Sequence, residues 1–358
     1  MTDVAALAYR IDSRGAQVAG KRLDGMSRAA VRADNQSTKL NKTAAALGRT
    51  LGRIAVAAAA AFGSAQVIRT LAGFEKQIAT VGAVSRATAE DLAAMRKVAA
   101  DLGATTEFSA TQAGQGLEFL ARAGFSADES ISAIPAVLNL ATAATIGLGS
   151  AADISSNIMS AFGIEATKAA SVADVLAAAS SRANTDVAQL GDAMSFVGPV
   201  ASALGISMSD AASAIGVLSD AGIQGSTAGT GLRRVLSSLA NPTKDAARTL
   251  AALGISLEDV NPQTNDLTDI VDRLSGVGLS AADALTIFGD RGGPAILALT
   301  SQNEKLRELT NSMGDVTGEA ERMADQIRDN LSGDIDSLVS SVQALIIAMG
   351  DSGLTAAL

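Results

Sequence analysis

A short cassette recurs along the chain, in which a glycine, an apolar residue and a serine lead into an alanine-rich stretch. One copy lies within residues 204–225 and reads LGISMSDAASAIGVLSDAGIQG, and variants read AGFSADESISAI (123–134), LGISLEDV (253–260) and VGLSAADALTIF (277–288). A glycine just past a helix adopts the left-handed conformation cheaply, and the apolar residue after it packs on the residue five positions earlier. Each cassette therefore predicts a corner, the place where one helix ends and the next begins.

The residues around the cassettes support this interpretation. At five predicted corners, the residue five positions before the apolar one is also large and apolar. These pairs are Leu120 with Phe125, Met159 with Ile164, Leu218 with Ile223, Leu250 with Ile255, and Leu274 with Leu279. Only Ile206, which follows Ala201, lacks such a partner. An acid three residues after the serine is typical of a capping box, as in Ser126 with Glu129, Ser207 with Asp210, Ser256 with Asp259, and Ser280 with Asp283. Thr88 with Asp91 and Ser109 with Gln112 repeat the pattern without the glycine.

The corners predict how the helices follow one another. The predicted corner residues are Gly124, Phe125, Ser126, Gly163, Gly205, Ser207, Gly254, Ser256, Gly278, Ser280, Gly293 and Pro294. The last two belong to FGDRGGPAILAL (288–299), which we interpret as a rigid corner. Glycines 124, 163, 205 and 254 are 39, 42 and 49 residues apart, close to a helical-hairpin repeat but too irregular for a strict solenoid.

Composition favours an all-α fold without a sheet, because alanine is abundant and aromatic residues make up only 3% of the chain. We expect a basic, polar, extended helical segment at 1–53 and an alanine-rich apolar helix at 54–73. Residues 74–300 are predicted to form an array of short antiparallel helical hairpins with glycine and serine corners. Residues 301–358 are predicted to form a charged amphipathic or coiled-coil exit helix, because Met323, Ile327, Leu331, Ile335, Leu338 and Val342 follow helical spacing.

Missing residue types exclude much of enzyme chemistry. The chain has no histidine, the usual general base near neutral pH, and no cysteine, so it has neither thiolate metal sites nor disulfides. Carboxylate pairs such as Glu258 with Asp259 and Asp266 with Asp269 could suggest glycoside hydrolysis, but the chain has no tryptophan and one tyrosine for sugar stacking. We therefore predict no catalytic residue, no metal site and no cofactor.

One stretch, GSTAGTGLRR at 225–234, has the glycines of a phosphate-binding loop before a helix. The P-loop spacing fails and no Gly-Lys-Ser/Thr sequence is present. We interpret it as a flexible loop that leads into the start of a helix.

Charge and hydropathy suggest two further partners. Residues 1–53 hold ten Lys/Arg against four Asp, a net charge of +6, which leaves −15 on the rest of the chain. This basic segment has one aromatic residue and no base-reading motif, so we expect no sequence-specific nucleic-acid partner. The uncharged stretches 54–68 and 131–152 are interpreted as buried helices packed through small residues, with conditional membrane insertion as the alternative.

Residues 74–138 resemble the core region of phage tail tape measure proteins. The resemblance rests on the phenylalanine–acid pair Phe74 and Glu75, the corner LGATTEFSATQAG and the alanine–glycine–phenylalanine step at Phe125. It continues through GSTAGTGLRRVLSSLANPTKDAARTLAALGI (225–255) and ends near FGDRGGPAILAL, so that it covers roughly 74–300.

This resemblance implies a structural virion protein that sets tail tube length during assembly, occupies the tube lumen and leaves ahead of the DNA. The implied partners are the tail tube protein, tail assembly chaperones and distal tail or baseplate hub proteins, and the chain is expected to be a homo-oligomer, with a trimer favoured. The implied location is the tail tube lumen or tail tip, and the host cytoplasm during assembly. The chain is shorter than tape measure proteins commonly are, so we expect a small tape measure or the N-terminal part of a larger one.

Two alternatives from other functional classes remain open. One is a membrane-perturbing ejection protein that forms a DNA passage in the host inner membrane. The other is a cell-wall lytic enzyme.

Overall fold

The structure, a computed structural model, describes residues 64–351, and these residues confirm the all-α prediction. They form fifteen α-helices and one short 3-10 helix, with no strand. The extended helix predicted for 1–53 lies outside the described residues, as does the first half, 54–63, of the predicted helix at 54–73.

The helices follow one another closely, with connections of a few residues except before α12. In chain order they are α2 (Ser64–Ser85), α3 (Ala89–Thr105), α4 (Ala110–Arg122), α5 (Ala127–Ala143), α6 (Leu148–Phe162), η1 (Ala166–Lys168), α7 (Ala169–Arg182), α8 (Val187–Ala203), α9 (Met208–Asp220), α10 (Gly225–Ala240), α11 (Lys244–Ala252), α12 (Leu267–Gly276), α13 (Ala281–Ser301), α14 (Asn303–Ser312), α15 (Glu319–Arg328) and α16 (Leu331–Asp351).

The chain divides into two units between Arg69 and Thr70. The first unit is described only over 64–69, the beginning of α2. Helix α2 runs without a break to Ser85, through the segment boundary that the sequence analysis places between residues 73 and 74.

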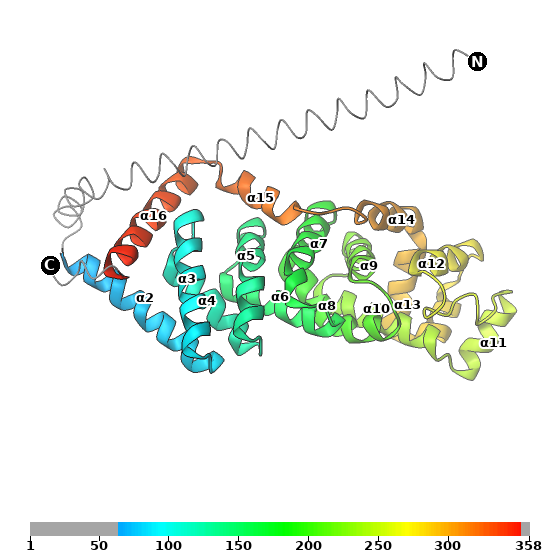
Figure 1. The fold of residues 1–358 in the computed structure, drawn as a ribbon. Coiled ribbons are helices and arrows are strands. Elements are labelled where there is room, and N and C mark those ends of the chain that lie inside the picture. Colours follow the sequence, from blue (N-terminus) through cyan, green and yellow to red (C-terminus); the bar gives the residue numbers. More distant parts are fainter. Residues whose placement is uncertain (1–63, 352–358) are drawn as a thin grey trace, which may run out of the picture. The chain divides into compact units, whose positions relative to one another are not determined.

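Within the second unit, α3–α13 form an array in which most helices pack against their neighbours in sequence, whereas α11 packs against α13 (Figure 1). Helix α4 packs against α3, α5 and α6, α8 packs against α6, α9 and α10, and α10 packs against α13. A continuous apolar core runs through the array, and Phe74 and Phe288 are among its largest fully buried side chains. Many of its other members are alanines, which let helix axes approach closely.

The last three helices form a C-terminal strap, residues 303–351, that returns along the array. Helix α14 packs against α9 and α12, α15 against α7 and α5, and α16 against α3 (Figure 1). The strap therefore passes the array helices in the reverse of their chain order.

The single exit helix predicted from the apolar spacing of residues 323–342 is wrong. The chain ends α15 at Arg328 and bends by 97° into α16. The side chain of Asn330 accepts a hydrogen bond from the Gly333 backbone N–H at 3.1 Å, and its carbonyl accepts from Asp334, so it starts a new helix. The apolar spacing continues across this break because both helices keep their own apolar face.

Candidate functional site

The corner glycines have the left-handed backbone that their position requires. Positive φ values occur at Gly124 (95°), Gly163 (65°), Gly205 (79°), Gly254 (77°) and Gly278 (66°). At the first four of these corners the apolar residue after the glycine donates its backbone N–H to the carbonyl five residues back, at 2.8–3.1 Å. Ile206 makes this bond to Ala201 although alanine offers it little to pack on. The backbone bond therefore closes the corner even where the side-chain partner is small.

Serine and threonine begin the next helix at most of these corners. Thr88, Ser109, Ser126 and Ser280 each form a full capping box with the residue three positions on. Ser207 accepts from the Asp210 backbone N–H at 3.1 Å and donates to its carboxylate at 2.6 Å. Each box satisfies helix N–H groups that would otherwise lack a partner.

Ser256 does not restart a helix as predicted. Its hydroxyl contacts Asp259 as in the other corners, with the Asp259 backbone N–H 3.1 Å away, but residues 257–260 form only a turn. Pro262 disfavours helical backbone at Asn261, so no room is left for a helix to propagate. The next helix, α12, begins at Leu267.

The corner predicted at Gly293 and Pro294 is misplaced. Both residues lie inside α13, and the break in that helix is at Gly289, with φ 68° and ψ −175°. The glycines that follow serve close packing instead, because a Cβ on Gly292 would lie 2.8 Å from the Phe288 Cβ. Pro294 lies five residues after the break, inside the second half of this helix.

At one corner a threonine takes the left-handed position that glycine takes in the cassettes. Between α5 and α6, Thr145 has φ 54°, and the Ile146 N–H donates to the Ala141 carbonyl at 3.0 Å, the same bond as at the glycine corners. A β-branched residue in the left-handed region is strained. Sequence reasoning missed this corner because its usual marker, glycine, is absent.

The glycine-rich stretch 225–234 is a helix and not the loop that we predicted. Helix α10 begins at Gly225, and its glycines lie against neighbouring helices. A Cβ on Gly229 would lie 2.1 Å from the Ala193 carbonyl oxygen of α8, and one on Gly231 would lie 2.9 Å from the Ala295 Cβ of α13. The glycines thus allow α8, α10 and α13 to approach more closely than any side chain would permit.

The glycine-rich stretch 225–234 and the stretch 288–299 border one pocket of about 490 Å³. It is lined by Phe196, Ile223, Ser226, Thr227, Thr230, Asp290, Arg291 and Pro294. The Arg233 guanidinium lies 5.8 Å from the centroid of the Phe196 ring, which is partly exposed.

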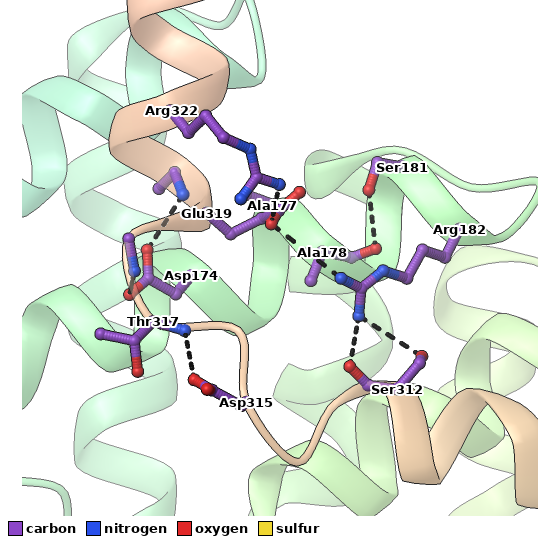
Figure 2. A network of polar contacts seen from close by, with 12 residues as sticks. Asp174, Ala177, Ala178, Ser181, Arg182, Ser312, Asp315, Thr317, Glu319 and Arg322 are labelled. Atoms are coloured by element: carbon purple, nitrogen blue, oxygen red, sulfur yellow. Dashed lines mark hydrogen bonds and ion pairs between the residues drawn. The ribbon is translucent and has the colours of Figure 1, made fainter. Parts of the chain in front are cut away.

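A buried carboxylate joins the strap to the array. Asp174 of α7 is 6% exposed, and its two oxygens accept from the backbone N–H groups of Gly318 and Ala320, both at 2.9 Å (Figure 2). These N–H groups lie at the start of α15, whose N-cap residue Gly318 has no side chain to cap the helix. Asp174 therefore caps a helix that lies more than 140 residues further along the chain.

Further polar contacts flank this cap. Arg182 donates to the Ser312 carbonyl at 2.5 Å and lies 3.9 Å from the Glu319 carboxylate (Figure 2). Closer to α16, Arg328 donates to Glu107 at 2.6 Å and to Asn139 at 3.0 Å. Because Glu107 also accepts from Thr142, these contacts tie the start of α4, helix α5 and the strap into one network.

The family model of phage-related minor tail proteins matches residues 96–349, which include nearly all of the array and the strap. The chain belongs to this family. Two curated relatives agree with this assignment: the tape measure protein of Pneumococcus phage Dp-1 is 35% identical over 281 residues, and the probable tape measure protein of Escherichia phage P2 is 31% identical over 367 residues. No solved structure matches.

The shared region is only part of each relative. The alignments take in 76% and 96% of this chain but 24% and 44% of the phage Dp-1 and P2 proteins, so the chain spans less than half the length of the relatives it matches. Membership in the minor tail protein family makes this chain a structural component of a phage tail.

In this minor tail protein, several carboxylates have structural partners. The pKa of the exposed Asp259 carboxyl is lowered, chiefly by its hydrogen bond with the Ser256 side chain. The positive charge of Arg273, 3.3 Å away, lowers it further by a smaller amount. Hydrogen bonds from the Ser126 backbone and hydroxyl likewise lower the pKa of Glu129. Burial raises the pKa of Glu118, but hydrogen bonds from Gln77 and Arg122 outweigh it and lower the pKa overall. Across residues 64–351 no three acidic side chains lie close enough together to hold a metal ion.

The apolar stretch 131–152 of this tail protein is divided between α5 and α6 by the corner at Thr145. Within the described part of the chain, no single helix is long and apolar enough to cross a membrane. The bent pair formed by α15 and residues 333–348 of α16 together has the length and apolar composition of a candidate membrane span, by those two measures only.

Proposed function

We propose that this protein acts as a tail tape measure: it sets the length of the tail tube during assembly, occupies the tube lumen and is released ahead of the DNA at ejection. Its family and the names of two relatives support this role. An all-helical chain suits a ruler, because a helix advances a fixed 1.5 Å per residue. A fully extended helix of 358 residues would reach about 540 Å.

In the folded array, the length of the molecule is not proportional to the number of residues. Two residues of the strap, Arg328 and Ser340, donate hydrogen bonds to Glu107, which lies 221 and 233 positions earlier in the chain. While those bonds hold, residues inserted between their ends do not lengthen the molecule by 1.5 Å each. We therefore propose that residues 70–351 enter the tail as a folded body of fixed length, and that length is measured in proportion to residue number by extended helix elsewhere in the protein.

Insertions of equal length at two places test this proposal. We would insert about 42 helical residues, worth about 63 Å of helix, either into the loop at 261–265 or into the segment 1–53, and measure tail lengths by electron microscopy of the assembled phage. We expect lengthening only for the second insertion. Equal lengthening for both would show that the array extends in the tail, and unchanged tails for both would refute the tape measure role.

The tail tube protein, tail assembly chaperones and distal tail or baseplate hub proteins are the partners that follow from this role, and we propose that the chain forms a homo-oligomer, with a trimer favoured by the family. The proposed location is the tube lumen or tail tip, and the host cytoplasm during assembly. Chain mass measured by light scattering at several concentrations would test the trimer. A monomer at all concentrations would contradict it.

A membrane-perturbing role during ejection is the second candidate function. It is supported by the bent pair of α15 and α16 and by three apolar side chains of α16 that are about half exposed or more, Ile335, Leu338 and Val339. Dye leakage from liposomes tests it, with the triple change of these three residues to serine as the control. Leakage that is equal for both proteins, or absent from both, would exclude this use of α16.

A further inference from the structure

Ion pairs between residues far apart in sequence lie where the strap meets the array. Five ion pairs among the described residues connect positions more than 30 apart in sequence, and every one has a partner in the strap: Arg182 with Glu319, Lys305 with Asp220, Arg307 with Asp269, Arg307 with Asp272, and Arg328 with Glu107. The array helices make no such long-range pairs with one another in this part of the chain. Long-range ion pairs therefore add to the apolar contacts that attach the strap, whereas the array helices pack against one another through apolar contacts.

The middle of the strap has little apolar anchorage. Helix α15 fully buries only Ala320 and Ala324 as apolar residues, Met323 is partly buried against the core, and Ile327 is 41% exposed. An alanine methyl contributes far less on burial than a leucine or phenylalanine side chain. Helices α14 and α16 add a few larger contacts at the two ends, among them Leu306 and Ile347.

Asp174 is the centre of this attachment. Its two hydrogen bonds to the start of α15 are charge-assisted, and one is buried and the other partly buried, which makes them stronger than an ion pair in full contact with solvent. They also place the negative carboxylate at the positive end of the α15 helix dipole. Without Asp174, two N–H groups at the start of α15 lose their partners.

We propose that residues 303–351 form a releasable strap, which undocks from the array helices when the Asp174 cap and the surrounding ion pairs are lost, while the array stays folded. The array can remain folded because its own helices share a buried apolar core: α8, α10 and α13 pack against one another through Leu190, Val197, Leu232, Leu236 and Ile296, all fully buried. Local opening of this kind is expected where buried apolar contacts are few. The proposal is independent of the tape measure role.

Distances between spin labels on the full chain test the proposal directly. The chain has no cysteine, so labels can be placed at will. One pair, Ser132→Cys with Gln326→Cys, joins α5 to α15, and a second pair, Ser132→Cys with Ser195→Cys, lies within the array; all three positions are exposed. Each pair is measured in the parent chain, in Asp174→Asn and in the matched control Asp153→Asn, which removes an exposed carboxylate on α6, a helix that the strap does not cover.

In Asp174→Asn we expect the fraction of molecules with a lengthened strap distance to rise by about ten-fold or more, because an amide can accept only at its oxygen and its NH₂ group faces an N–H donor. Raising salt from about 0.1 M to about 1 M should add a smaller increase by screening the exposed pairs. The array distance should stay unchanged, as should both distances in Asp153→Asn. Two results would overturn the proposal: array and strap distances that broaden together, or a strap distance unaffected by both Asp174→Asn and high salt.

Discussion

The array and the strap solve the same problem, holding helices side by side, by different physical means. The array uses apolar burial, close approach at helical glycines and corners closed within six residues of chain. The strap uses charged hydrogen bonds between residues 35 to more than 200 positions apart. Apolar packing is not weakened by ionic screening but tolerates added volume poorly, whereas exposed charged contacts are weakened by salt. The two regions should therefore fail under different perturbations.

The largest expected effect is at the closest contact of the array. Gly229→Ala places a Cβ against the Ala193 backbone of α8, which cannot move aside as a side chain could, so we expect a loss of about 3 kcal/mol in the free energy of unfolding. Urea denaturation followed by circular dichroism measures it. Gly73→Ala, in a helix with open space around the new methyl, is the matched control and should stabilise by about 0.5–1 kcal/mol. A loss below about 1 kcal/mol for Gly229→Ala would mean that α8 and α10 can move apart at little cost in free energy.

This contact shows what could not be predicted from the sequence. The glycines of 225–234 suggest a loop when they are taken alone, because a glycine inside a helix lowers helix propensity, and only the neighbouring helix reveals why they are there. Corners were easier, since a glycine, an apolar residue and a cap lie within a few residues of each other. The corner at Thr145 was not predicted, because its left-handed backbone is imposed by the helices on both sides and not by a glycine.

The attachment of the strap was beyond sequence reasoning for a different reason. Asp174 is one polar residue in an alanine-rich helix, and nothing in its local sequence points to Gly318 or Ala320. The apolar spacing through residues 323–342 predicted one helix because a period carries no information about a bend between two helices that share it. The local cap at Asn330 decides the bend.

The next effect is specific to the strap. Arg328 bonds Glu107 and Asn139 with separate guanidinium nitrogens, and a lysine cannot reach both, so Arg328→Lys should weaken strap docking by about 1–2 kcal/mol. Hydrogen exchange measures this effect: the amides of α15 should exchange about ten-fold faster, while those of α8 and α10 keep their rates. Arg248→Lys, at a site 77% exposed and paired only with Asp245, is the control and should change nothing measurable. Faster exchange throughout the array would show that the two regions form one cooperative unit.

A smaller effect is expected at the corner between α5 and α6, where a threonine has the left-handed backbone. Thr145→Gly relieves a left-handed β-branched residue, and after the added flexibility of the unfolded chain is subtracted we expect a gain of about 0.5–1 kcal/mol. Gly205→Thr is the converse change, at a corner with open space and φ 79°, and should destabilise by about 1–2 kcal/mol. Thermal unfolding of both variants gives the comparison. If Thr145→Gly destabilises, the threonine side chain must contribute more than its strain costs.

The smallest effect separates the charge inside a corner from the charge that holds the strap. Hydrogen bonds from Ser126 lower the pKa of Glu129 below its ordinary 4.5, so this contribution to stability is complete above the unfolded pKa and is lost as pH falls through the folded one. Glu129→Gln keeps a capping box of the kind that Ser109 forms with Gln112, without the titration. Because Glu129 is exposed and screened, we expect a change below about 0.5 kcal/mol at pH 7 and a slightly shallower loss of stability below about pH 4.5. Urea titrations from pH 7 to about pH 3 measure this. A large change at pH 7 would show that the corners of the array, like the strap, depend on charge.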